Sequence, residues 1–170
     1  RSVFIRTFGC NFTCPSFGLP KGEKTTEPAE FAKTMNVYKS LLDVPAAKFG
    51  CDSYYSVYPE FKGLSPFIET EELAAQAIQA AGNSFFTGSN PIHLILTGGE
   101  PMLGWQRSYP ELIAAIKRLD PLWTEVSEHT KLDVTIETNG TQKLQKDFMK
   151  QVAESCNITW SVSPKLTVSG

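Results

Sequence analysis

Four short apolar segments separated by helical patterns limit the fold of this chain more than any other feature. They cover residues 2–8, 92–97, 132–138 and 158–163. Several show little strict alternation of apolar and polar residues, which is typical of strands in a parallel sheet covered on both faces. Alternation of such strands with helices predicts an α/β fold with right-handed crossovers. We expect a partial (βα) barrel of parallel strands.

Three segments between these strands have the apolar periodicity of helices. Segment 70–82 begins with Thr70 as its N-cap, carries acidic residues in its first turn and ends at a glycine. Segment 109–120 has one apolar stripe. Segment 144–155 has another, formed by Leu144, Phe148 and Val152.

The length of 170 residues predicts a single domain over 1–170, and no linker divides it. We expect the chain to be truncated at both ends, and at its N-terminus it opens without methionine and already in a strand-like run. Two segments interrupt the repeated pattern. Segment 15–50 contains a helical pattern at 28–43, and segment 52–68 is rich in aromatic residues.

Charge and hydropathy exclude several classes of protein. The formal net charge is −2 and Lys and Arg form no dense stripe, so nothing indicates direct binding to nucleic acid. No apolar run is long enough to span a bilayer, and we see no signal peptide. A chain of this size does not need disulfides, so its four cysteines are expected to be metal ligands or core residues in a cytoplasmic protein.

Polar or glycine-rich sequences follow each of the four predicted strands. They are GCNFTC, TGGEPML, ETNGT and SPK, in chain order. The carboxyl ends of parallel strands meet at one edge of a sheet, where ligands commonly bind. Each sequence alone is typical of an ordinary turn, but four at one edge predict a ligand site.

Some side chains at this edge suggest particular roles. The paired glycines of TGGEP let the backbone approach a ligand closely, and Glu100 can accept hydrogen bonds from an ammonium group. Glu137 ends a buried strand, so we expect its carboxylate to have a partner. His93 lies at the opposite end of its strand and His129 in a polar connection, so neither is expected to be catalytic.

Cys10 and Cys14 have the spacing that opens an iron–sulfur motif, in which a third cysteine usually comes three residues later. Phe17 occupies that position. Cys51, much later in the chain, is the candidate third ligand. Cys156 precedes the fourth strand, at the end away from the predicted site, and is best interpreted as a buried core residue. A structural zinc site formed by all four cysteines remains an alternative.

Together these motifs resemble the radical S-adenosylmethionine superfamily and, within it, the 7-carboxy-7-deazaguanine synthases. Members of that family typically carry R-x-x-G-C-N, C-D-T, GGEP, ETNGT and SPK in this order. The chain has RTFGCN at 6–11, CDS at 51–53, GGEP at 98–101, ETNGT at 137–141 and SPK at 163–165. The resemblance spans almost the full chain.

The resemblance implies a [4Fe–4S] cluster held by Cys10, Cys14 and Cys51, with 15–50 inserted within the cluster loop. It implies S-adenosylmethionine at Gly98, Gly99, Glu100, Glu137 and Ser163, with Glu100 on the methionine amino group. It also implies Mg²⁺ held partly by Ser53, and substrate contacts from Arg6 and Lys165.

The implied enzyme is a lyase that converts 6-carboxy-5,6,7,8-tetrahydropterin to 7-carboxy-7-deazaguanine, in 7-deazaguanine (queuosine or preQ0-type) biosynthesis. A 5′-deoxyadenosyl radical abstracts hydrogen before ring contraction and loss of ammonia. The expected partners are the pterin and an electron donor such as flavodoxin or ferredoxin, without nucleic acid or membrane, and a homodimer is left open.

Two other functions remain alternatives, an activase that makes a glycyl radical on a partner protein and a zinc-binding module without activity. Within the implied enzyme, Tyr54, Tyr55 and Tyr58 either wall the pterin pocket or pack under the long loop.

Overall fold

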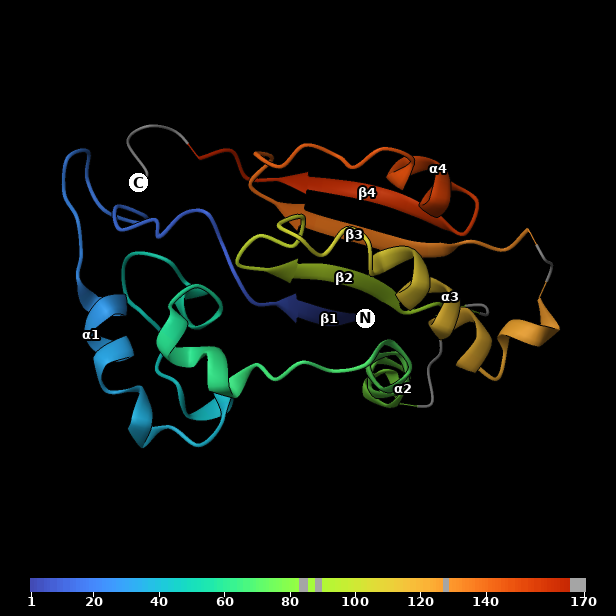
Figure 1. Ribbon diagram of the computed structural model, residues 1–170, viewed down its shortest axis with the longest axis horizontal. Helices are drawn as coiled ribbons and strands as arrows, with labels where there is room; N and C mark the ends of the chain where they lie inside the picture. The colour runs from blue at the N-terminus through green and yellow to red at the C-terminus, as the bar shows by residue number, and fades with distance from the viewer. Residues whose placement is uncertain (83–85, 88–89, 127–128, 166–170) are drawn as a thin grey trace.

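The computed structural model describes residues 1–82, 86–87, 90–126 and 129–165. Its centre is a parallel sheet of four strands in the order β1-β2-β3-β4, so each strand pairs with its neighbour in sequence (Figure 1). The strands are β1 (Ser2–Thr7), β2 (His93–Gly98), β3 (Leu132–Thr138) and β4 (Cys156–Val162). The predicted α/β class and its four parallel strands are confirmed.

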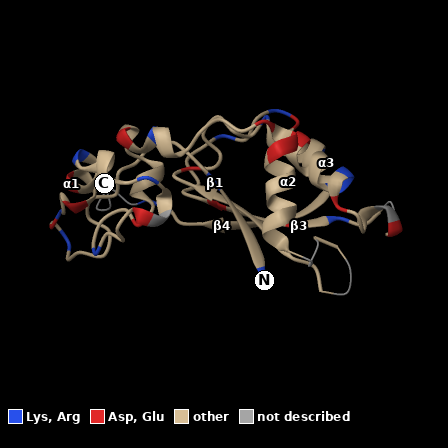
Figure 2. Cartoon of the chain, turned by 90° about the horizontal axis from the view of Figure 1, so that it is seen from below, with Lys and Arg blue, Asp and Glu red and all other residues tan. Residues whose placement is uncertain are grey.

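Three helices pack on one side of the sheet (Figure 1). They are α2 (Thr70–Ala81), α3 (Tyr109–Leu119) and α4 (Phe148–Ala153), and Figure 2 shows two of them, α2 and α3, edge-on to the sheet. Their apolar faces and alternate residues of the strands form the main core, in which Leu94, Val134 and Ile116 are almost completely buried. Among the described residues, no helix is both long and apolar enough to span a membrane.

The described helices cover one face of the sheet. The apolar strand sequences had predicted that helices would cover both faces. In β1, Val3 and Ile5 are buried under the helices, but Phe4 between them is 58% exposed. β3 alternates in the same way. The reason is topological, because crossovers of one hand between consecutive neighbours place every helix on the same side.

Two predicted helix starts differ from the structure. Thr70 is the first residue of α2 rather than its N-cap, which is Glu69. Helix α4 begins at Phe148, so Leu144 lies outside it and is exposed. The buried Gln106 explains this difference, because it accepts a hydrogen bond from the backbone N–H of residue 145 and donates one to the carbonyl of residue 143. These hydrogen bonds to Gln106 use backbone groups that a longer helix would need for its own hydrogen bonds.

The part of the chain between β1 and α2 forms a compact unit beside the carboxyl ends of the strands (Figure 1). It contains α1 (Glu27–Lys33) and the 3₁₀ helices η1 (Met35–Val37), η2 (Leu41–Asp43), η3 (Tyr54–Ser56) and η4 (Pro59–Leu64). Its own core is built around Ala32, Tyr54 and Phe61. Tyr54 is fully buried, and its ring lies edge-on to that of Phe61. Tyr54 therefore packs under the long loop, as one of the two interpretations predicted.

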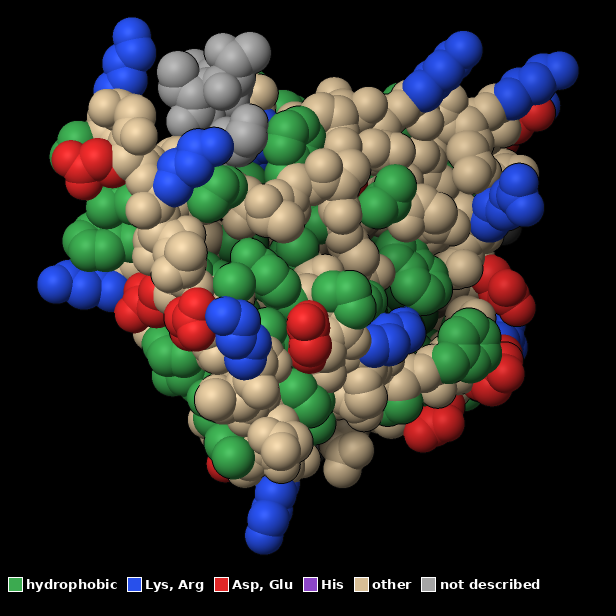
Figure 3. All heavy atoms as spheres, turned by 60° about the vertical axis from the view of Figure 1, so that its left-hand side comes forward, with side chains coloured by type: hydrophobic (Ala, Val, Ile, Leu, Met, Phe, Trp, Pro, Cys, Tyr) green, Lys and Arg blue, Asp and Glu red, His purple; other side chains and the backbone are tan. Residues whose placement is uncertain are grey.

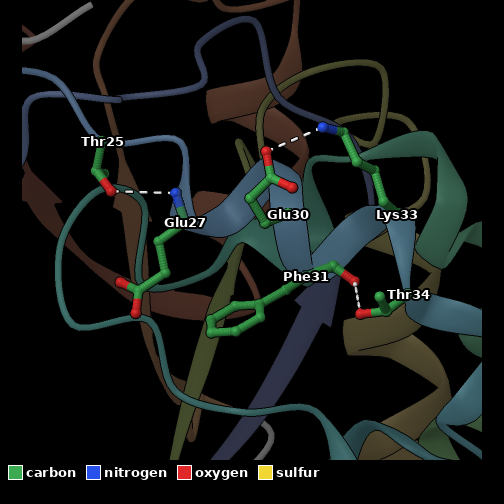
Figure 4. Close-up of polar contacts among 6 residues, drawn as sticks. All are labelled: Thr25, Glu27, Glu30, Phe31, Lys33 and Thr34. Carbon is green, nitrogen blue, oxygen red and sulfur yellow. Dashed lines mark hydrogen bonds and ion pairs between the residues drawn. The ribbon is translucent and has the colours of Figure 1, made fainter.

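Helix α1 is shorter than the 28–43 pattern suggests because local side chains close both of its ends (Figure 4). The hydroxyl of Thr25 accepts a hydrogen bond from the backbone N–H of Glu27 (3.1 Å). Thr34 donates its hydroxyl to the carbonyl of Phe31 (3.1 Å). After the helix, the carboxylate of Asp43 accepts hydrogen bonds from the backbone N–H groups of residues 39 and 40, and these bonds stabilise a separate 3₁₀ turn.

Candidate functional site

A cavity of about 400 Å³ lies at the carboxyl ends of the four strands and is lined by the loop after each of them. This volume is within the usual range for small-molecule sites. Of the residues predicted for the site, the cavity is lined by Arg6, Cys10, Cys14, Cys51, Ser53, Gly98, Gly99, Glu137, Ser163 and Lys165. Glu100 is not among the lining residues. The parallel sheet thus brings together residues up to 159 positions apart.

Cys51 lies beside the position where a closely spaced third cysteine would stand. The N–H of Gly50 donates to the carbonyl of Phe17 (2.8 Å), and the N–H of Thr25 donates to the carbonyl of Pro15 (2.9 Å). The first bond joins the two ends of segment 15–50, and the second closes a loop within its first part. Because its ends are joined, Cys51 reaches the cavity despite its distance in sequence.

The three thiols of the cavity are partly or fully buried and interact electrostatically. The pKa of Cys51 is raised to about 11, mainly by burial, with smaller contributions from charge on Cys14, Asp52 and Cys10, and a backbone hydrogen bond from Ser53 opposes part of this rise. Burial also raises the pKa of Cys14, while the Lys165 ammonium opposes part of this rise. These two free thiols are therefore protonated at neutral pH, and each must lose its proton when it binds a metal centre.

These thiols do not converge as ligands of a single ion would. In the described part of the chain, no three His, Cys, Asp or Glu side chains form a group that could hold one metal ion. An iron–sulfur cluster has a different requirement, because each cysteine binds a different iron at a separate corner. The three cysteines line one cavity, as such an arrangement needs.

Cys14 has an unusual backbone conformation. Its φ of 47° lies in the left-handed region, which is uncommon for residues other than glycine, and its side chain is only 6% exposed. Such a conformation costs roughly 1–3 kcal/mol and persists only where the surroundings impose it. The loop therefore holds this thiol at the cavity against a local preference.

Cys156 takes no part in the cavity. It is the first residue of β4, at the end of the strand opposite the site, and its thiol donates to the carbonyl of Val152 (3.1 Å). Its interpretation as a core residue is confirmed. A zinc site of all four cysteines conflicts with this arrangement.

The Gly98–Gly99 turn lies against the loop that carries Cys10. A Cβ atom added to Gly99 would be 2.4 Å from the carbonyl oxygen of Gly9 and 2.8 Å from the Cβ of Cys10. The next N–H, of Glu100, donates to that same carbonyl of Gly9 (2.8 Å). The glycines are therefore required for close contact between two parts of the chain as well as for exposure of backbone to the cavity.

Glu100 is completely buried behind the cavity wall. Its carboxylate accepts hydrogen bonds from the hydroxyl of Thr138 (2.5 Å), the N–H of Asn139 (2.7 Å) and the N–H of Met102 (3.0 Å). This carboxylate thus ties the turn after β2 to the turn after β3. The structure does not bring it to the cavity, where a ligand's amino group would bind.

Arg6 and Ser53 form a polar pair at the cavity. The guanidinium of Arg6 donates to the hydroxyl of Ser53 (2.8 Å), which donates in turn to the carboxylate of Asp52 (3.2 Å). Arg6 also lies over the ring of Tyr55, 5.6 Å from its centre. A cation that binds the Ser53 hydroxyl would therefore lie next to the positive charge of Arg6.

The remaining predicted residues lie on β3 and just after β4. Glu137 is exposed rather than buried, which corrects the expectation that its carboxylate needs a protein partner. Ser163 is held in place by its N–H, which donates to the carbonyl of Thr138 (2.8 Å). Lys165 supplies a positive charge to a cavity lining that also contains Glu137 and Asp52.

Sequence reasoning included the ETNGT turn but missed the side chain of Asn139. It is only 6% exposed, lines the cavity and contacts both Asn11 and Cys10. The signal that could have found it is its place at the centre of a motif following a core strand. Asp52 also lines the cavity and was considered only as part of the CDS match.

Figure 3 turns the end with the compact unit toward the viewer and shows hydrophobic side chains exposed between charged ones. Phe17 at the cavity is 55% exposed.

Comparison of the chain with protein-family models, with curated proteins and with solved structures found no match.

Proposed function

We propose that this chain is a radical S-adenosylmethionine enzyme of the 7-carboxy-7-deazaguanine synthase type, with a partial-barrel fold. In this proposal it converts 6-carboxy-5,6,7,8-tetrahydropterin to 7-carboxy-7-deazaguanine in the cytoplasm, with flavodoxin or ferredoxin as electron donor. One observation carries the proposal, namely that Cys10, Cys14 and Cys51 line the same cavity as the three later motifs.

The donor set fits a [4Fe–4S] cluster. Thiolates are the soft ligands that iron–sulfur clusters require, and three of them leave one iron open for another ligand. When bound, the reduced cluster would supply one electron to the sulfonium of S-adenosylmethionine, producing methionine and a 5′-deoxyadenosyl radical. The backbone hydrogen bond from Gly50 to Phe17 supports this use of Cys51, because it holds the two ends of segment 15–50 together.

The other lining residues would bind and orient small molecules. The backbone at Gly98 and Gly99, the carboxylate of Glu137 and the hydroxyl of Ser163 offer hydrogen-bonding groups to S-adenosylmethionine. Glu100 contributes by fixing the turn, because its own carboxylate is already bonded by the protein.

The substrate carboxylate would pair with the positively charged Arg6 and Lys165. Mg²⁺ would bind the hydroxyl of Ser53 against repulsion from the nearby Arg6 guanidinium, and a substrate carboxylate that pairs with Arg6 would reduce this repulsion.

Anaerobic reconstitution with iron and sulfide tests the proposal. The wild-type protein should bind about four irons, and Cys10→Ser, Cys14→Ser and Cys51→Ser should each lose most of them. Cys156→Ser is the matched control, because its thiol lies at the other end of the sheet. Equal loss in all four variants, or zinc in place of iron in the wild type, would contradict the proposal.

Two activity assays then follow with the reconstituted protein. Reduction should release 5′-deoxyadenosine from S-adenosylmethionine, and carboxytetrahydropterin should be converted to the deazaguanine product. Cleavage without turnover of the pterin would contradict the proposed substrate and favour the activase.

A further inference from the structure

Asn139 forms a polar network that joins three of the four loops around the cavity. Its backbone N–H donates to the carboxylate of Glu100 (2.7 Å). Its side-chain Nδ2 donates to Oδ1 of Asn11 (3.0 Å) and lies 4.0 Å from the sulfur of Cys10. Asn11 in turn donates to the hydroxyl of Thr141 (2.9 Å).

The orientation of the Asn139 amide follows from these contacts. Oδ1 accepts the backbone N–H of Thr141 (3.0 Å) and its hydroxyl (2.6 Å). A backbone N–H can only donate, so the oxygen must face Thr141. The NH₂ group must therefore face Cys10 and Asn11.

This orientation places the positive end of an amide dipole toward the sulfur of Cys10. Asn139 is 6% exposed, so water screens its dipole weakly. Dipoles and hydrogen bonds at cysteine sulfurs stabilise the more negative, reduced state of a bound cluster and so raise its reduction potential.

We propose that Asn139 is a positioning residue that holds the Cys10 loop and raises the reduction potential of the cluster. The proposal rests on the proposed function, because it requires a cluster at the three cysteines. It goes beyond that function, since it names a residue that controls how readily the centre accepts an electron.

Two variants separate the dipole from the shape of the side chain. Asn139→Asp keeps the shape and the oxygen facing Thr141 but replaces the NH₂ group with oxygen and adds a negative charge, which by itself also lowers the potential. Asn139→Leu removes the dipole at similar volume. The control is Asn157→Ala, because Asn157 is exposed on β4 and its side chain donates to Asp133, away from the cavity.

The measurements are iron content after anaerobic reconstitution, iron retention against a chelator, and the midpoint potential followed by electron paramagnetic resonance. We expect both Asn139 variants to retain iron about tenfold less well. We also expect the redox equilibrium to shift about tenfold toward the oxidised state, which is about 59 mV for one electron. Asn157→Ala should match the wild type in all three.

Each outcome decides between the proposals. A wild type that assembles no cluster overturns the proposed function and this inference together. A wild type that assembles one, with unchanged potential and iron retention in both folded Asn139 variants, overturns this inference alone. If the Asn139→Leu variant does not fold, the near-isosteric Asn139→Asp variant decides. Loss of iron from folded Asn139→Asp protein, with iron kept by Asn157→Ala, supports the positioning role.

Discussion

Substitution of Gly99 by alanine tests the contact between the glycine turn and the cysteine loop. The new Cβ would lie 2.4 Å from the carbonyl oxygen of Gly9, whereas ordinary contacts begin at 3.4 Å. The loop must therefore move by about 1 Å. That movement strains or breaks the bond from the N–H of Glu100 to Gly9.

The expected cost combines two effects. Overpacking of this kind costs typically about 1–3 kcal/mol, and loss of one hydrogen bond adds about 1 kcal/mol. We therefore expect Gly99→Ala to lower the free energy of unfolding by about 2–4 kcal/mol. In a domain of this size, that lowers the melting temperature by roughly 4–16 °C.

Gly63→Ala is the matched control. A Cβ added to Gly63 has no heavy atom within 4 Å, and its backbone does not require positive φ. Its substitution should change stability by less than about 1 kcal/mol. Urea unfolding of both variants without metal gives the comparison. If Gly99→Ala unfolds at the same urea concentration as Gly63→Ala, the steric argument is wrong.

Three further substitutions test other parts of the structure. Phe61→Ala should lower the free energy of unfolding by about 3–5 kcal/mol because Phe61 is fully buried in the compact unit, and hydrogen exchange should accelerate in 27–64 more than in the strands. Gly50→Ala should destabilise by about 1–3 kcal/mol, measured by urea unfolding, because its φ is 83° and its Cβ would lie 2.8 Å from Thr25; an unchanged midpoint would contradict this. Burial raises the pKa of Asp120 above its unfolded value despite hydrogen bonds from the N–H groups of residues 86 and 122. The folded state therefore binds the carboxyl proton of Asp120 more tightly than the unfolded state does. The stability that this protonated carboxyl contributes is complete below the unfolded pKa and is lost as pH rises through the folded pKa. Urea unfolding across that window should show wild-type stability falling relative to Asp120→Asn, and parallel pH profiles would refute the sign.

The alternation of strands and helices could be predicted from the sequence because it depends on local composition. Apolar runs such as 132–138 and periodic segments such as 109–120 carry the same signal in isolation as in the fold. Parallel pairing then places all four loops at one edge, so the location of the cavity also follows from the order of the elements.

Contacts between distant residues decided what local patterns could not. Gln106 binds the backbone before α4 and so moves the start of that helix from the predicted 144 to Phe148. Glu100 looks like a ligand-binding carboxylate in sequence, yet the turn after β3 supplies its hydrogen bonds and buries it. The backbone hydrogen bond from Gly50 to Phe17 places Cys51 at the cavity. A sequence records which donors and acceptors exist, but only the folded chain brings each to its partner, and burial then makes that pairing obligatory.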